Sequence, residues 1–377
     1  MDLSTYRLRV LAGVAVAVLG AGATPAGAAP ENLTCTACYL VDDTGTVLFD
    51  RAGDVALANA STTKMTTALA ALERLAPDDR VTVSPRAAGT GGGGLDLEAG
   101  SVYTVETLLH ALLMTSSNDA AVALAEATAG SEAAFVEAME RYAAGLGATD
   151  TSYATAHGLD MPGHASSAAD LAVIARALLE VPLLADIVAR AEASVPGPDG
   201  GILLENRNLL LETYRGATGV KTGFTADAGN VLVASAERHG RRLIAVVMHS
   251  VDATADATAL LDHGWDRLRR TPLLRGGTAV GAVVLDGGST VATAAGTVRG
   301  AYDPATVTHV FEPAATIRLP VAAGDVIGRV SVRAGDRTLS SVPAVAGSEV
   351  RAARRSAVAD AVASLIAALA PVVGVGR

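Results

Sequence analysis

The sequence predicts an α+β domain followed by a small all-β domain. Strand-like segments near the N-terminus precede a block of helix-periodic segments, and strand-like segments then return before a last helix, which is the order typical of an α+β domain. Beyond Pro272 the chain contains short runs rich in Val, Thr and Gly without helical periodicity. The 377 residues are 50% hydrophobic and 18% charged, which excludes a disordered chain and leaves room for two domains.

The first 28 residues have the composition of an export signal. Arg7 and Arg9 precede an uncharged stretch at 10–23, and the small residues at 26–28 follow it. The uncharged stretch is shorter than the roughly 20 residues that a membrane span needs, although a retained membrane helix is the alternative. We therefore expect residues 1–28 to be removed on export, so that the mature protein works outside the cytoplasm.

Local patterns predict the elements of the larger domain, which we place at 33–271. The turn residues 42–45 separate β-rich runs at 39–41 and 47–49, which predicts a β-hairpin. From Ser61 onward apolar residues recur three and four positions apart as far as Leu75, which predicts the first long helix. Further helices are expected at 105–114, 119–129, 132–146 and 168–179. Two strands and a closing helix are then expected at 230–236, 243–248 and 255–270.

The remaining chain predicts a β-rich domain and a terminal helix. Strands are expected in a domain over 274–346, at 278–285, 290–293, 307–311, 316–321 and 326–332. Residues 350–377 begin with arginines and continue with apolar residues at helical spacing. The uncharged stretch 361–375 would reach only about 22 Å as a helix, short of the ~30 Å hydrocarbon core. We expect this helix to lie on a membrane surface; packing on the protein's own body is the alternative, and Asp360 interrupts the apolar face.

Charge and cysteine content restrict the partners. The net charge of −10 excludes the basic surface that nucleic-acid binding needs. Cys35 and Cys38 are too few for a four-thiolate zinc site. A disulfide between them requires a local turn, because residues three apart in an extended strand lie too far from each other, and the sequence leaves this pairing open. His157 and His164 lack the spacing of a zinc motif, so no metal site is expected.

Two lysines point to a catalytic site. Lys64 and Lys221 are the only lysines among 29 basic residues, so both positions need a lysine in particular. Ser61 and Lys64 lie one helical turn apart on one face. A serine hydroxyl becomes a nucleophile when a base takes its proton, and a lysine can be that base when burial or a second cation lowers its pKa. Lys221, before an expected strand, supplies that cation.

Two further motifs complete the constellation. In Lys221-Thr222-Gly223 the glycine lets a substrate backbone approach closely. Ser116-Ser117-Asn118 lies at an expected corner between helices and offers a hydroxyl proton relay and an amide. The glycine-rich segment 89–94 lacks the ending of a phosphate loop and is expected to be a loop near the cleft. The alternative of a helix cap, a surface amide and a solvated lysine does not explain why the chain avoids lysine elsewhere.

The combination S-x-x-K, S-x-N and K-T-G resembles the motif set of penicillin-binding proteins and serine β-lactamases. Five segments follow the order seen in D-alanyl-D-alanine carboxypeptidases, the low-molecular-mass penicillin-binding proteins: 60–69, 116–121, 157–160, 206–210 and 219–225. This resemblance covers about 36–270, and the later regions also resemble that family's second domain and membrane anchor. Asn59 replaces the usual Pro, Ser117 the usual Gly, and Thr155-Ala156 the common Asn-Pro.

The resemblance implies an antiparallel sheet packed with helices and a serine-type D-Ala-D-Ala carboxypeptidase without metal or cofactor. It would remove the terminal D-Ala of peptidoglycan stem pentapeptides and bind β-lactams covalently. The roles that the resemblance implies are Ser61 as nucleophile, Lys64 as general base, Ser116 as proton relay, and Asn118, Lys221, Thr222, Gly223 and Phe224 as substrate-binding residues. The backbone N–H groups of Ser61 and Phe224 would hold the oxyanion.

Two other functions stay open. A β-lactamase is the nearest, but the Glu-x-x-x-Asn pattern of a class A deacylating base is absent between Ser116 and Lys221. The extra β-rich domain also disfavours it. A penicillin-binding sensor without enzymatic activity would share the fold but deacylate slowly.

Overall fold

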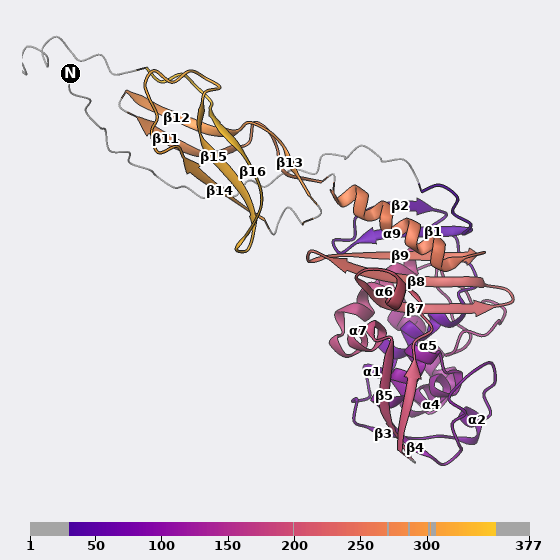
Figure 1. Ribbon diagram of the computed structural model, residues 1–377. Coiled ribbons are helices and arrows are strands. Elements are labelled where there is room, and N and C mark those ends of the chain that lie inside the picture. Colours follow the sequence, from indigo (N-terminus) through magenta and orange to yellow (C-terminus); the bar gives the residue numbers. More distant parts are fainter. Residues whose placement is uncertain are drawn as a thin grey trace, which may run out of the picture. The chain divides into compact units, whose positions relative to one another are not determined.

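The computed structural model describes residues 30–351 except 199, 270, 286, 301 and 303–306. The described residues form two compact units, which divide between Leu268 and Arg269. The first unit combines an antiparallel sheet with helices, and the second consists of strands (Figure 1). The predicted α+β fold with a following β-rich region is therefore confirmed. The export signal expected at 1–28 and nearly all of the helix expected at 350–377 lie outside the described residues.

Five antiparallel strands form the main sheet of the first unit, in the order β2-β1-β9-β8-β7. Their bounds are β1 Ala37–Asp42, β2 Val47–Arg51, β7 Ala217–Thr225, β8 Gly229–Arg238 and β9 Arg241–Ser250. The expected hairpin is β1 with β2, and the two later expected strands are the inner parts of β8 and β9. Because β7 is at the edge of this sheet, one side of its backbone is left for other contacts.

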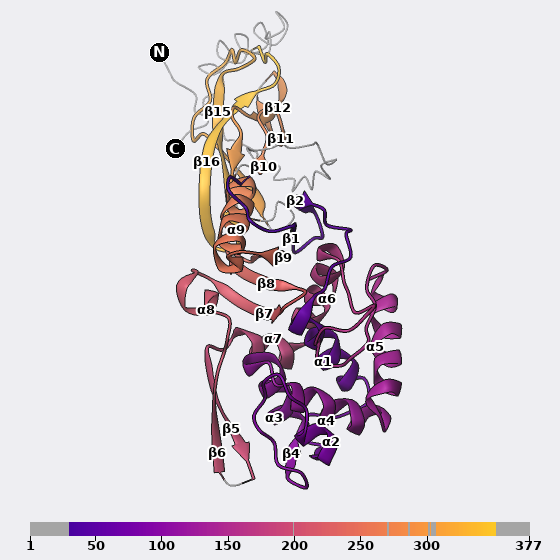
Figure 2. The same ribbon diagram turned by 90° about the vertical axis from the view of Figure 1, so that its right-hand side faces the viewer.

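Helices cover both faces of the sheet, and side chains of β9 pack against each of the two helical layers. Val246 and Met248 belong to the core shared with the helices of the middle of the chain. Leu243 instead contacts Gly264 of α9 (Ala253–Arg269), where an added Cβ would lie 2.6 Å from the leucine Cδ1. The two-residue alternation of a strand produces this division. Figure 2 shows α9 on one side of the sheet and α1, α5 and α6 on the other.

The helices from the middle of the chain form a layer on the inner face of the sheet, where α6 and α7 contact its strands and other helices pack behind them. Their bounds are α1 Lys64–Leu72, α2 Pro85–Ala88, α3 Val105–His110, α4 Asn118–Ala129, α5 Glu132–Leu146, α6 Ala168–Glu180, α7 Pro182–Ala189 and α8 Leu210–Thr213. The first helix begins as a 3₁₀ turn, η1 (Ala60–Thr63), and ends at Leu72, so Leu75 lies beyond it. The expected helix at 105–114 is α3 followed by a π-helical turn, η2 (Ala111–Thr115).

Two short antiparallel strand pairs of this unit have no counterpart in the sequence predictions. They pair β3 (Arg80–Thr82) with β4 (Val102–Thr104) and β5 (Glu192–Gly197) with β6 (Gly200–Glu205). The local sequence of β5 and β6 gives a weak strand signal, because proline and glycine are depleted in strands. Pro196 lies in β5, and the consecutive glycines Gly200 and Gly201 begin β6. Packing in the folded unit, rather than propensity, produces this hairpin.

The second unit contains a five-stranded antiparallel sheet in the order β11-β12-β16-β15-β14 and a short pair, β10 with β13. The bounds are β10 Pro272–Leu274, β11 Ala279–Leu285, β12 Gly288–Ala294, β13 Val298–Arg299, β14 Thr308–Pro313, β15 Val326–Ala334 and β16 Arg337–Ala346. Val280, Val283, Ile327 and Val330 are buried in its core.

One expectation for this unit was wrong, and one strand was not foreseen. The strand expected at 316–321 is absent apart from an isolated bridge between Val321 and Val350. Pro320 cannot donate a ladder hydrogen bond, which explains the break. The central strand β16 is not among the expected strands, because Ser340, Ser341 and Pro343 dilute its apolar pattern.

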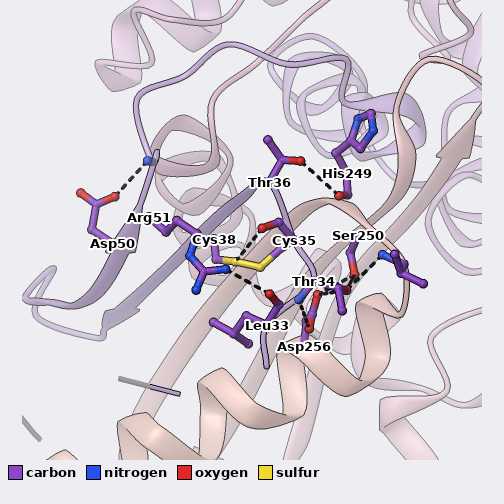
Figure 3. The surroundings of a disulfide bond; sticks show 12 residues. Leu33, Thr34, Cys35, Thr36, Cys38, Asp50, Arg51, His249, Ser250 and Asp256 are labelled. Atoms are coloured by element: carbon purple, nitrogen blue, oxygen red, sulfur yellow. Dashed lines mark hydrogen bonds between the residues drawn. A yellow bond between two sulfur atoms is a disulfide. The ribbon is translucent and has the colours of Figure 1, made fainter. Parts of the chain in front are cut away.

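Cys35 and Cys38 form a disulfide, with their Cα atoms 6.1 Å apart (Figure 3). The chain bends at Thr36 just before β1 begins, which supplies the local turn that the pairing requires. The disulfide fits an oxidising compartment. Among the described residues, we find no helix that has both the length and the apolar composition needed to cross a membrane.

Candidate active site

A cavity of about 690 Å³ lies beside the edge strand β7 and the start of the helical layer. Six of the eight predicted site residues line it: Ser61, Ser116, Asn118, Thr222, Gly223 and Phe224. The other two, Lys64 and Lys221, are almost completely buried next to them, at 0% and 1% exposure. Three segments that are far apart in the sequence therefore meet at one site.

Ser61 is presented by the 3₁₀ turn η1, which local polar contacts stabilise. The Asn59 side-chain amide donates to the hydroxyls of Thr62 and Thr63, at 3.4 and 3.0 Å. These hydroxyls donate in turn to the carbonyls of Asn59 and Ala60, at 2.6 and 2.7 Å. Asn59, one of the departures from the family pattern, thus closes the turn with a side chain that proline lacks.

Lys64 is surrounded by oxygen atoms. Its Nζ lies 2.9 Å from Ser61 Oγ, 2.7 Å from Asn118 Oδ1 and 2.6 Å from the carbonyl oxygen of His157. Burial, reinforced by the charges of Lys221 and Arg207, holds the pKa of Lys64 well below its usual value. The amine is therefore neutral in a larger fraction of molecules than a solvated lysine, and it contacts a hydroxyl whose proton it can accept.

The S-x-N segment lies in the corner between η2 and α4, as expected. Ser116 adopts a left-handed conformation with φ 66° and lines the cavity. The Asn118 backbone N–H donates to Gly93 O at 2.9 Å, and its side-chain amide donates to Gly91 O at 2.9 Å. Asn118 therefore connects Lys64 to the glycine-rich segment 89–94.

The glycine-rich segment forms a wall of the cavity. The carboxylate of Asp119 accepts hydrogen bonds from the backbone N–H groups of Leu95 and Leu97, each at 3.1 Å. A Cβ on Gly94 would overlap this carboxylate, so the close approach requires glycine there. Gly92 lines the cavity directly. The expected loop near the cleft is found at this position.

The K-T-G motif lies within β7, not before a strand as the sequence suggested. Its residues pair with β8, Lys221 opposite Val233 and Gly223 opposite Val231. Lys221 Nζ donates to Thr222 O at 2.9 Å, and burial together with the charge of Arg207 lowers the pKa of Lys221 to about 7. Gly223 brings the backbone of β7 close to the nucleophile, since a Cβ there would lie 3.1 Å from Ser61 N.

Two groups in the site were not assigned from the sequence. Arg207 lines the cavity and acts electrostatically on both lysines. It lies in the segment 206–210 that contributed to the resemblance, but neither its residue type nor its spacing indicated a role. The His157 carbonyl is a backbone group, so no side-chain pattern could reveal it as a partner of Lys64.

The two histidines have structural contacts. His164 Nε2 lies 2.7 Å from Thr63 Oγ1, and its Nδ1 accepts from Ala154 N at 3.0 Å. His157 Nε2 lies 3.5 Å from Glu132 Oε1. Burial lowers the pKa of each histidine to about 4. Within the part of the chain that the structure describes, no group of three or more His, Cys, Asp and Glu side chains is arranged to hold a metal ion.

The sequence is similar to those of known proteins. Residues 24–252 match the profile of a peptidase family described as D-alanyl-D-alanine carboxypeptidase. The chain is 35% identical over 257 residues to the D-alanyl-D-alanine carboxypeptidase DacF of Bacillus subtilis, and the match covers 66% of each chain. It is 39% identical over 231 residues to DacB2 of Mycobacterium tuberculosis, covering 60% of this chain and 79% of the relative.

Solved structures show the same likeness. A D-alanyl-D-alanine carboxypeptidase from Mycobacterium tuberculosis superposes with a TM-score of 0.62 at 36% identity, over 65% of this chain and 96% of that one. The carboxypeptidase DacD of Francisella tularensis superposes with a TM-score of 0.60 at 26% identity, over 88% of this chain and 98% of that one. The second match reaches beyond the unit that contains the cavity.

Proposed function

We propose that the chain, which belongs to the D-alanyl-D-alanine carboxypeptidase family, removes the terminal D-Ala from peptidoglycan stem pentapeptides. The reaction would proceed through an acyl-enzyme on Ser61, and β-lactams would acylate the same hydroxyl. The observation that carries this proposal is the fully buried amine of Lys64, which lies within hydrogen-bonding distance of Ser61 Oγ and has a lowered pKa. A positioned base of this kind makes the serine nucleophilic.

Acylation begins when Ser61 Oγ attacks the carbonyl carbon between the two D-alanines. Neutral Lys64 has two N–H bonds, which it can donate to Asn118 Oδ1 and His157 O. Its lone pair is then left for the third neighbour, the Ser61 hydroxyl, whose proton it takes. Asn118 thereby orients the base as well as forming part of the cavity wall.

The developing oxyanion would be held by the backbone N–H groups of Ser61 and Phe224. The close approach of β7 to η1 at Gly223 supports this assignment. The terminal carboxylate of the substrate would bind Lys221 and Thr222, in a region whose positive charge Arg207 increases. Ser116 and Lys221 would pass a proton to the departing D-Ala, and a pKa of about 7 lets Lys221 exchange protons near neutral pH.

A β-lactamase and a non-enzymatic penicillin sensor would use the same nucleophile, so the test must separate deacylation rates. The mature chain, incubated with Nα,Nε-diacetyl-L-Lys-D-Ala-D-Ala, should release D-Ala steadily over many turnovers. A fluorescent penicillin should label the protein once, with the adduct on Ser61 by mass spectrometry, and Ser61→Ala should abolish both results. Rapid penicillin turnover without D-Ala release would indicate the β-lactamase, and labelling without either turnover would indicate the sensor.

We also propose that the enzyme works outside the cytoplasm on the membrane surface. The export signal expected at 1–28 and the disulfide of Cys35 with Cys38 support export. The basic start and apolar stripe of 350–377 support membrane attachment. Deleting 350–377 should move the protein from the membrane to the soluble fraction while D-Ala release persists; unfolding of the truncated chain would show that this segment belongs to the folded body.

A further inference from the structure

The cavity is electrically asymmetric. Among the described side chains that line it, Arg207 is the only cation and Asp252 the only anion. The proposed reaction uses the cationic part, where Arg207 and Lys221 suit a carboxylate. Asp252 takes no part in that chemistry, yet it is open to solvent and lines the same cavity as Ser61. Its charge therefore needs a different explanation.

Asp252 is held in place at the junction of β9 and α9. Its Oδ1 accepts a hydrogen bond from Ala255 N at 3.0 Å, and so caps the first turn of α9. The backbone N–H groups of Val251 and Asp252 point to Thr34 Oγ1, at 3.1 and 3.4 Å. One oxygen is used by the cap, which leaves the other able to accept from a ligand.

The residues behind this junction form a compact polar cluster. The backbone N–H of Thr34 donates to Asp256 Oδ1 at 2.9 Å, and the Thr34 hydroxyl donates to Asp256 Oδ2 at 2.8 Å. Ser250 Oγ also donates to Asp256 Oδ2, at 2.6 Å. Thr34 directly precedes the turn that the disulfide of Cys35 and Cys38 closes (Figure 3). The carboxylate at the cavity rim is therefore supported by an ordered, cross-linked segment rather than by a loose loop.

The sheet register relates the segment before Asp252 to the strand that contains K-T-G. Asn230 of β8 is opposite Phe224 of β7 on one side and opposite Ser250 of β9 on the other. Its side-chain amide donates to the carbonyls of Ser250 and Val251, at 3.1 and 3.3 Å. Neighbouring strands lie about 4.8 Å apart, so Ser250, two residues before Asp252, is on the order of 10 Å from Phe224, the residue after K-T-G.

This separation is comparable to the distance from the terminal carboxylate of the substrate to the side chain of the residue before D-Ala-D-Ala. An extended chain advances about 3.3–3.6 Å per residue, so the residue before D-Ala-D-Ala lies roughly 7 Å from the terminal one. A long side chain on that residue reaches several ångströms further. Given the proposed function, we propose that Asp252 binds a free ammonium group on the side chain of the residue before D-Ala-D-Ala. Asp252 is then a specificity-determining residue that favours stem peptides whose diamino residue is not acylated.

The test compares two peptides that differ in one charge. Nα-acetyl-L-Lys-D-Ala-D-Ala keeps its ε-ammonium group, and Nα,Nε-diacetyl-L-Lys-D-Ala-D-Ala lacks it. A partly solvated ion pair predicts that the wild type prefers the charged peptide by about two- to five-fold in kcat/KM. In Asp252→Asn, which keeps the capping oxygen, this ratio should fall to about one. The matched control Asp78→Asn, at an exposed acid outside the cavity, should keep the wild-type ratio.

Salt provides a second measurement that needs no variant. At 1 M NaCl the screening length is about 3 Å, so the wild-type ratio should also approach one. Equal kcat/KM for the two peptides in the wild type, or a preference that persists in Asp252→Asn, would overturn the assignment of Asp252 while the carboxypeptidase activity stands. Failure of the wild type to release D-Ala from either peptide would instead overturn the proposed function, and this inference with it.

Discussion

The side-chain nitrogen of Lys64 lies 2.7 Å from Oδ1 of Asn118, although 54 positions separate the two residues in the chain. This contact joins the first turn of α1 to the first turn of α4. It acts with the His157 carbonyl to hold the amine next to Ser61. The position thus demands a compact amine that can lose its proton, which explains why the chain keeps a lysine here.

Replacing Lys64 by Arg should reduce penicillin acylation by about 10²- to 10⁴-fold, the usual cost of losing a positioned base. A guanidinium keeps its charge but cannot release its proton near neutral pH. Stopped-flow acylation kinetics measure the rate, and circular dichroism monitors the fold. Lys221→Arg, which preserves the charge for the carboxylate, should lose less. Acylation of Lys64→Arg at close to the wild-type rate would rule out the general-base role.

Replacing Arg207 by Gln should move the acidic limb of the acylation pH profile to higher pH. The positive charge of Arg207 lowers the pKa of both Lys64 and Lys221. Removing it favours the protonated amines, so each pKa rises and a higher pH is needed to neutralise Lys64. The profile is measured as kcat/KM for penicillin acylation between pH 5 and 10. Arg141→Gln, at an exposed arginine paired with Glu137, is the matched control, and an unshifted limb in Arg207→Gln would contradict the electrostatic coupling.

Replacing Gly94 by Ala should destabilise the protein by about 1–3 kcal/mol, the usual cost of overpacking. The new methyl group would overlap the Asp119 carboxylate and disturb its bonds to Leu95 and Leu97. Urea unfolding measures the change. Gly91→Ala is a matched control in the same segment, because an added Cβ there meets no atom within 4 Å. Equal stability of the two variants would show that the loop tolerates displacement of Asp119.

Removing the disulfide with the double substitution Cys35→Ala and Cys38→Ala should cost roughly 2 kcal/mol of unfolding free energy, as expected for a loop of about four residues. Adding dithiothreitol to the wild type should produce a similar loss, whereas the double variant should not respond to it. Unfolding curves with and without the reductant make this comparison. A wild-type curve that reductant leaves unchanged would show that the bond does not contribute to stability.

The chemistry of the site and much of the helical layer could be predicted from local residue patterns. Helices α4, α5 and α6 were expected from their Ala- and Leu-rich sequences; α5 buries one face against the core, whereas the first eight residues of α4 are all buried. Local spacing also placed Ser61 and Lys64 on one turn. The rarity of lysine singled out Lys64 and Lys221, and the three motifs together resemble those of serine D-Ala-D-Ala carboxypeptidases.

Long-range packing brings together the groups that complete this site. Arg207, the His157 carbonyl and Asp252 reach the cavity or Lys64 although neither residue type nor spacing assigned any of them a role. β5 and β6 pair despite their proline and glycines, and K-T-G lies within an edge strand whose position depends on β8 and β9. The spacing of residues in the sequence predicts contacts within one helical turn or across one hairpin. The pKa of a buried lysine and the charge at a cavity rim depend instead on long-range packing, which brings distant segments into a medium of low polarity.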